Sequence, residues 1–359
     1  MTKKYILITL LCTAWVANAQ KSLPEKTFKN VSFVVVPNVY YSPETRFGGG
    51  IAGIYLFKTD STTRTSNLDF GLLYTQRKQL IFEPIWNIFT KRERFFVKGI
   101  MLYTHFPDYF FGVGNKTTLQ NREQIDYKIF RLHNQVFHQL KKGIFVGLQY
   151  QLFHTYDVRF AENTMYLPST LEGYKGSFSS GLGYDLLYDT RDNITNPQKG
   201  VFIEVSNLIY SKFLGSSQRF SNYLFDYRQY FPLKNKAVIA TQMLTNLNFG
   251  AVPFRQMATI GGANTMRGYY TGHFRDKNLL ALQAEYRQQI GKTRFGYTVF
   301  GGAANVSNSV KTLLTLTPKY SLGVGLRIRL SKKENVNVRG DAGFGQKSKG
   351  LYGNFGEAF

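Results

Sequence analysis

Segments in which apolar and polar residues alternate recur along most of this chain. In residues 320–330, "YSLGVGLRIRL", the aromatic and aliphatic residues share one face, while serine, glycine and arginine share the other. Residues 222–231 and 279–288 alternate in the same way. A period of two indicates a β-strand with two different faces, because successive side chains point to opposite sides. A polar face of glycine, serine and arginine fits a wet interior better than the charged outside of a soluble sandwich.

The amino-terminal residues have the features of an export signal. Lys3 and Lys4 precede a short apolar run, which ends at the small residues "ANA". We therefore expect a secretory signal peptide over residues 1–19, not a membrane span. Cys12 is the single cysteine of the chain and lies inside this segment, so the mature protein is expected to have no disulfide.

The rest of the chain has no run near the roughly 18 apolar residues of a membrane-spanning helix. The full chain is rich in aromatic residues, with 31 phenylalanines and 24 tyrosines. An exported, aromatic-rich chain can still cross a membrane as a β-barrel, in which the strands satisfy one another's backbone groups. The expected fold is all-β, a transmembrane antiparallel β-barrel.

The alternating segments number about sixteen, and an even number is typical of single-chain bacterial barrels. They begin near residues 31, 47, 67, 79, 94, 127, 143, 175, 200, 219, 236, 278, 293, 319, 335 and 351. Three parts are expected along the chain. These are a signal peptide (1–19), a short periplasmic amino-terminal segment (20–30) and an outer-membrane β-barrel domain (31–359).

The lengths of the connections predict the orientation of the barrel. The longest ones lie around residues 105–126, 156–174, 250–277 and 303–318, and each follows an odd-numbered strand. The connections after even-numbered strands are short. Outer-membrane barrels have long extracellular loops and short periplasmic turns, so residues 250–277 are predicted to be an extracellular loop.

Composition limits the partners and the chemistry. The formal net charge is +23. An exported protein with such a charge is expected to meet anionic outer-membrane lipids, not nucleic acid. The histidines show no metal-ligand spacing, and no nucleophile motif occurs. We therefore expect no metal, no cofactor and no enzymatic activity. A lipid-modifying enzyme is the remote alternative.

Several motifs together resemble the BamA/TamA superfamily of outer-membrane assembly and translocation barrels, the bacterial surface antigen type. The segment "GGANTMRGYY" is similar to the family's glycine-rich loop, and it is followed by "EYR" on the next strand. The segment "YDTRDNITNPQKG" resembles a family motif at a periplasmic turn. The loop residues that carry the resemblance are Gly261, Gly262, Met266, Arg267, Gly268 and Tyr269. The turn residues are Asp189, Arg191, Asp192, Asn193, Pro197 and Gly200.

The resemblance implies that this extracellular loop folds back into the lumen, where Arg267 meets an acid on the barrel wall. By alternation Glu285 faces the lumen, so it is the expected partner. Where family members often carry a second acid, this chain has Gly302, which leaves Glu285 as the main partner, helped by Asp226 or Asp341. In a wet lumen the contact is expected to contribute about 1–2 kcal/mol. The turn residues are expected to form local caps.

The last strand is expected to end in an assembly signal. Phe355 and Phe359 alternate onto one face, and a terminal aromatic residue is similar to the signal that outer-membrane barrels present to their assembly machinery. That machinery is the expected partner during the chain's own insertion.

The function that the resemblance implies is help in inserting or translocating proteins, or lipids, at the outer membrane of a diderm bacterium. Only about ten residues separate the signal from the first strand, so the family's periplasmic POTRA modules are not expected, and a separate periplasmic protein is expected to deliver clients. The alternative is a passive pore or structural envelope barrel that keeps the fold without the activity.

Overall fold

A computed structural model describes residues 31–42, 46–76, 78–105, 107–161, 164–166, 170–331 and 335–359. The wall strands are β1 (Val31–Ser42), β2 (Arg46–Phe57), β3 (Ser66–Thr75), β4 (Leu80–Phe82), β5 (Ile85–Phe89), β6 (Phe95–His105), β8 (Glu123–Lys141), β9 (Ile144–Arg159), β10 (Ser177–Asp189), β11 (Gly200–Tyr210), β12 (Phe220–Pro232), β13 (Ala237–Gly250), β16 (Asn278–Gln289), β17 (Phe295–Ser307), β18 (Lys319–Ser331), β19 (Val336–Gly345) and β20 (Ser348–Phe355). Shorter strands and 3₁₀ turns in the connections are β7 (Asp108–Phe110), β14 (Ala258–Ile260), β15 (Phe274–Asp276), η1 (Lys91–Glu93), η2 (Leu119–Asn121), η3 (Lys212–Leu214), η4 (Lys234–Lys236), η5 (Phe254–Gln256) and η6 (Val310–Thr312).

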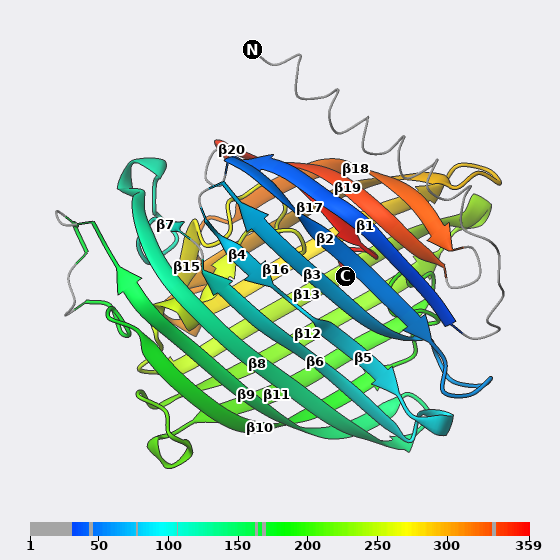
Figure 1. The fold of residues 1–359 in the computed structure, drawn as a ribbon, viewed down its shortest axis with the longest axis horizontal. Coiled ribbons are helices and arrows are strands. Elements are labelled where there is room, and N and C mark those ends of the chain that lie inside the picture. Colours follow the sequence, from blue (N-terminus) through cyan, green and yellow to red (C-terminus); the bar gives the residue numbers. More distant parts are fainter. Residues whose placement is uncertain are drawn as a thin grey trace.

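Neighbouring wall strands pair antiparallel in chain order, and the sheet curls into the barrel seen in Figure 1. Strands β4 and β5 form one interrupted wall strand, because both pair with β3 and with β6. The described wall therefore has sixteen strands, as the alternation predicts. Strand β8 begins at Glu123, four residues earlier than predicted, because its first residues pair with the short strand β7.

The two rims of the barrel differ in their connections. We call the rim that carries residues 106–122, 160–176, 251–277 and 308–318 the long-loop rim, and the opposite one the short-turn rim. The long connections follow odd-numbered wall strands, as predicted. Among the described residues, no helix is long and apolar enough to span a membrane. The predicted signal peptide and the segment 20–30 lie outside the described residues.

The predicted alternation holds in the wall. On β18, Leu322 and Leu326 are 69% and 71% exposed on the outer face, while Ser321 and Arg327 are buried on the inner face. An apolar outer band and a polar inner face are the pattern of a transmembrane barrel. The lumen also contains apolar clusters, because loops fold into it. One of them joins loop residues such as Ile260 to the inner faces of β16 and β17.

Among the residues that the structure describes, no hydrogen-bonded ladder joins the first and last strands. In the described residues, β1 pairs with β2 alone and β20 with β19 alone. Apolar packing joins them instead, because Ile54 and Leu56 on β2 form a buried cluster with Val336 at the start of β19, and Phe355 packs against this cluster. Figure 1 shows β1 and β2 in blue beside β19 and β20 in orange and red. We call this junction the seam.

Candidate functional site in the barrel lumen

The long loop between β13 and β16 enters the lumen and packs against the inner wall. It begins with η5 and forms a small hairpin of β14 and β15 before the chain returns to the wall. Residues 266–270, at the inner end, lie against β19 and β20. The approach is tight, because a Cβ atom on Gly268 would lie 2.6 Å from backbone atoms of Phe344, and one on Gly343 would lie 2.6 Å from the carbonyl carbon of Arg267. Gly268 has φ of 113°, a conformation that L-residues rarely adopt.

Arg267 is held between two carboxylates on the wall. Its Nη2 pairs with Glu285 of β16, and its Nη1 lies 2.5 Å from Oδ2 of Asp341 on β19. The ring of Phe300 on β17 lies 3.6 Å from the guanidinium carbon, so an aromatic face covers the cation as well. A planar guanidinium suits this position, because it can donate to two acceptors in different directions.

The second acid comes from a different strand than the motif suggests. Gly302 stands where the resemblance places an acid, and Asp341, two strands further on, supplies the carboxylate instead. Asp226 does not take part, since it pairs with Arg228 at 2.5 Å on its own strand. Glu285 is thus a partner of Arg267 as expected, and of the two possible helpers Asp341 contributes while Asp226 does not.

The contact of Arg267 with the two acids is shielded from water. The expectation of a wet contact is therefore wrong. The side chain of Arg267 is 1% exposed, and those of Glu285 and Asp341 are fully buried. The loop itself excludes water here, since Met266 and Tyr269 pack in the apolar cluster beside the arginine. Removing one member of such a buried group is costly, because its partners lose part of the charge that offsets their own.

The other loop-motif residues hold the backbone of the loop. The Met266 amide donates to the Gln283 side chain at 2.7 Å, and Met266 has φ of 55°. The Tyr269 hydroxyl donates to the Tyr320 carbonyl at 2.7 Å. Gly261 and Gly262 have φ of 110° and 107°, which only glycine adopts without strain.

The Arg267 contact belongs to a larger network of buried charges. Arg287 pairs with Glu285 at 2.7 Å, and Arg327 pairs with Asp341 at 2.6 Å. Both arginines also pair with Glu357, Arg327 at 2.7 Å and Arg287 at 3.7 Å. These six ion pairs form a closed ring whose members are Arg267, Glu285, Arg287, Glu357, Arg327 and Asp341. Sequence alternation could place Arg287 and Arg327 inside but gave no signal for Glu357.

Arg339 adds a further link between the loop and the wall. It pairs with Asp341 at 2.7 Å and donates to the carbonyl of Ala263 and to the side chain of Asn264, at 3.0 and 2.6 Å. The wall thus holds the loop at its backbone as well as at Arg267.

The family model for the Omp85 superfamily domain matches residues 59–331, which include the loop and most of the wall. This chain belongs to the Omp85 superfamily. No sequence among curated proteins matches it significantly.

The Omp85 assignment agrees with the solved structures that this fold resembles. BamA from Haemophilus ducreyi lacking POTRA domains 1–3 is 13% identical, with a TM-score of 0.56 over 91% of this chain and 69% of that one. CdiB from Acinetobacter baumannii and CdiB from Escherichia coli are 11% and 10% identical, both with TM-scores of 0.54. The match to the Acinetobacter baumannii protein covers 92% of this chain and 59% of that one, and the match to the Escherichia coli protein covers 93% and 62%. The chain therefore spans less than two thirds of each CdiB chain. At such identities the likeness shows the fold.

The predicted turn motif of this Omp85 barrel lies at the short-turn rim, between β10 and β11. The side-chain oxygen of Asn193 accepts three hydrogen bonds from Thr195 and Asn196, and one oxygen of Asp192 accepts the amides of Gln198 and Lys199. These contacts are the local caps expected of a firm turn. Pro197 is buried in it, and Gly200, with φ of 109°, ends it.

Two residues of this motif also form a buried ion pair. Asp189 pairs with Arg191 at 2.9 Å and with Arg64 at 2.7 Å, and its side chain is fully buried. Arg64 pairs in turn with Glu93 at 3.1 Å. Turns after β2, β5 and β10 are thereby tied together at the short-turn rim.

The chain end departs from the strand pattern that the sequence suggests. β20 ends at Phe355, so the alternation does not extend to Phe359. Phe359 is 3% exposed in the lumen, in a cluster with Tyr230, Val238 and Ala240. The role of Phe355 and Phe359 as an assembly signal stays a prediction.

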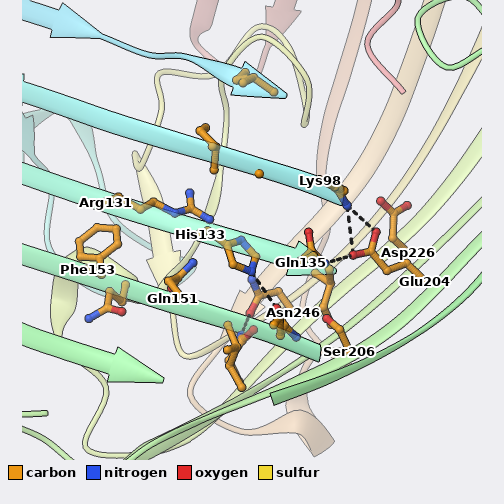
Figure 2. A pocket seen from close by; sticks show the side chains of 18 of the residues that line it. Lys98, Arg131, His133, Gln135, Gln151, Phe153, Glu204, Ser206, Asp226 and Asn246 are labelled. Carbon is orange, nitrogen blue, oxygen red and sulfur yellow. Dashed lines mark hydrogen bonds and ion pairs between the residues drawn. The ribbon is translucent and has the colours of Figure 1, made fainter. Parts of the chain in front are cut away.

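The loop leaves a polar cavity of about 670 Å³ between itself and the walls of β6, β8, β9, β11 and β12. Figure 2 shows Arg131, His133 and Gln135 pointing into it. At one end Glu204 accepts hydrogen bonds from Lys98 at 2.8 Å and Gln135 at 2.7 Å. The lumen is thus partly filled, by a charged and hydrogen-bonded lining.

Proposed function

We propose that this chain is an outer-membrane barrel of a diderm bacterium that assists the insertion or translocation of proteins, or lipids, at that membrane. The observation that carries the proposal is the unpaired seam in an Omp85 barrel. The long-loop rim would face the outside and the short-turn rim the periplasm.

The seam supplies a physical route for insertion. The edges of β1 and β20 offer backbone groups that are not paired with each other, and such edges are templates for another strand. In the described residues an apolar cluster joins the two sides, with Val34, Ile54 and Leu56 on one side and Val336 and Phe355 on the other. Apolar contacts of this kind can separate without breaking hydrogen bonds, so a client strand could enter there and pair with the free edges.

The locked loop keeps the rest of the barrel in shape while the seam opens. Arg267 binds strands β16 and β19 together through Glu285 and Asp341, on the side of the lumen next to the seam. We propose that this contact maintains the curvature of the last five wall strands, which would otherwise relax when β20 moves.

A separate periplasmic protein is proposed to bring clients to the short-turn rim. The exposed charged side chains at the short-turn rim of this chain are mostly cationic, among them Lys91, Lys141, Lys142, Lys234 and Lys292. These would contact anionic headgroups of the inner leaflet and acidic segments of a partner.

The test is reconstitution in liposomes with an unfolded barrel as client. Folding is followed by the change in gel mobility of the unheated client. A purified porin-type barrel in matched liposomes is the control. The proposal predicts faster client folding with this chain than with the control, and equal rates would overturn it.

The polar cavity supports a second candidate, a passive pore. Single-channel recording separates the two functions. A large and steady conductance together with no effect on client folding would favour the pore.

A further inference from the structure

The last four residues form a short tail that crosses the short-turn rim inside the barrel. At Gly356 φ is 71°, which turns the chain away from the wall after β20. The Gly356 amide donates to the Asn337 carbonyl at 2.8 Å, and the Glu357 amide donates to the Thr195 carbonyl at 2.7 Å. The tail therefore joins the last wall strands to the turn between β10 and β11.

Side chains hold the tail more firmly than its backbone does. The Glu357 carboxylate is 2% exposed and accepts from Arg327 at 2.7 Å and from Asn337 at 2.8 Å. An oxygen of the Phe359 α-carboxyl group accepts from Nη2 of Arg287 at 2.9 Å, and the Phe359 ring lies 5.4 Å from the guanidinium of the same arginine. Asp341 and Glu357 both lie beyond residues 59–331, which the family model matches.

The two arginines that hold the tail are the same ones that support the loop. Arg287 is the second partner of Glu285, and Arg327 is the second partner of Asp341. Because Glu285 and Asp341 are the two carboxylates that bind Arg267, each arm of the ring leads from the tail to the loop in three ion pairs.

We propose that the tail, residues 356–359, is a latch that holds the lumen loop in place, with Glu357 as its positioning residue. The charges give the reason. Four arginines at this site face three side-chain carboxylates, and Glu357 is one of the three. Without its charge, Arg287 and Arg327 lose a partner in a dry site, and their repulsion of Arg267 is less fully offset.

Coupling of this kind is reciprocal. If the tail stabilises the docked loop, the docked loop must stabilise the bound tail by the same free energy. The tail follows directly on β20, so its release also frees the short-turn end of that strand at the seam. The latch does not depend on the proposed insertion activity and can be tested on the purified barrel alone.

The first test is loop release in Glu357→Gln. The readout is the rate of protease cleavage within residues 262–275 of the folded, detergent-solubilised barrel. We expect the rate to rise about tenfold, which corresponds to about 1.4 kcal/mol. Glu93→Gln is the matched control, since Glu93 is also paired with an arginine at the short-turn rim but lies outside the ring. Equal cleavage of E357Q and E93Q would overturn the latch.

The second test runs in the opposite direction and does not need E357Q to fold. Arg267→Lys keeps the charge but cannot reach both carboxylates as a guanidinium does. Carboxypeptidase should release Phe359 from R267K several-fold faster than from the unchanged protein. Arg228→Gln, which removes a lumen arginine outside the ring, should not change the release. Unchanged release in R267K would show that the loop and the tail are independent.

Discussion

Arg267 is the residue on which the loop depends most. It is nearly inaccessible to solvent, and it reaches Glu285 and Asp341 from a backbone that close glycine contacts already fix in position. Each of those carboxylates keeps at least one further arginine. The loss of Arg267 therefore removes the loop's anchor without leaving either acid unpaired.

The first prediction concerns Arg267→Ala. Docking of the loop should weaken by about 3 kcal/mol, near the lower end of the range for a broken buried pair, because both acids retain partners. Protease cleavage within residues 262–275 should rise accordingly in the folded barrel. R228Q is the control, and cleavage equal to that of the control would contradict the role of Arg267.

Because of His273, in the same loop, we expect docking of the loop to depend on pH. Burial lowers its pKa and nearby Lys319 lowers it further, against a smaller opposing effect of a backbone hydrogen bond at Thr117. Its ring stacks on Phe274 at 4.3 Å and lies 4.7 Å from Phe111.

An undocked histidine titrates near pH 6.5, above the docked one, so the undocked loop binds more protons as the pH falls below about 6.5. The docking free energy of the loop should therefore become less favourable below about pH 6.5 and be constant at higher pH. Hydrogen exchange of the loop at pH 7.5 and 5.5, corrected for intrinsic rates, measures this. His273→Phe keeps the aromatic stack and should abolish the effect. The same pH response in both proteins would contradict the assignment.

At the scale of elements, alternation could predict the wall but not what fills it. The period of two fixes which side chains of β12, β16 and β18 face inward, because strand geometry alone sets it. It cannot show that Asp341 on β19 reaches a loop that leaves the wall after β13, since that contact follows from barrel curvature. Nor could it show that the strand pattern stops at Phe355, because the tail that begins at Gly356 contacts Asn337 on the neighbouring strand and Thr195 in the distant turn between β10 and β11.

The turn between β10 and β11 gives a prediction at this scale. Asn193→Ala removes the acceptor of the Thr195 and Asn196 amides, so the turn should lose about 1 kcal/mol of local stability. Hydrogen exchange at those two amides should become several-fold faster, while the amides of β10 stay protected. Unchanged exchange would mean that the turn does not depend on its cap.

At the scale of the whole molecule, the buried ring of ion pairs and the seam differ in how firmly they hold the barrel. The buried ring joins the loop, three wall strands and the tail, whereas an apolar cluster joins the two sides of the seam in the described residues. The molecule should therefore deform at the seam before it deforms elsewhere. This contrast connects the residue contacts to the proposed insertion of clients.

A reversible lock on the seam tests most directly whether clients enter there. Leu56→Cys and Val336→Cys place thiols on opposite sides of one buried cluster, and Cys12 is the chain's only other cysteine. A short bis-methanethiosulfonate reagent would join them, and a reductant would release them. The readout is the folding rate of an unfolded barrel client in liposomes. If clients enter at the seam, locking should abolish the acceleration and reduction should restore it. Equal acceleration by the locked and the reduced barrel would contradict entry at the seam.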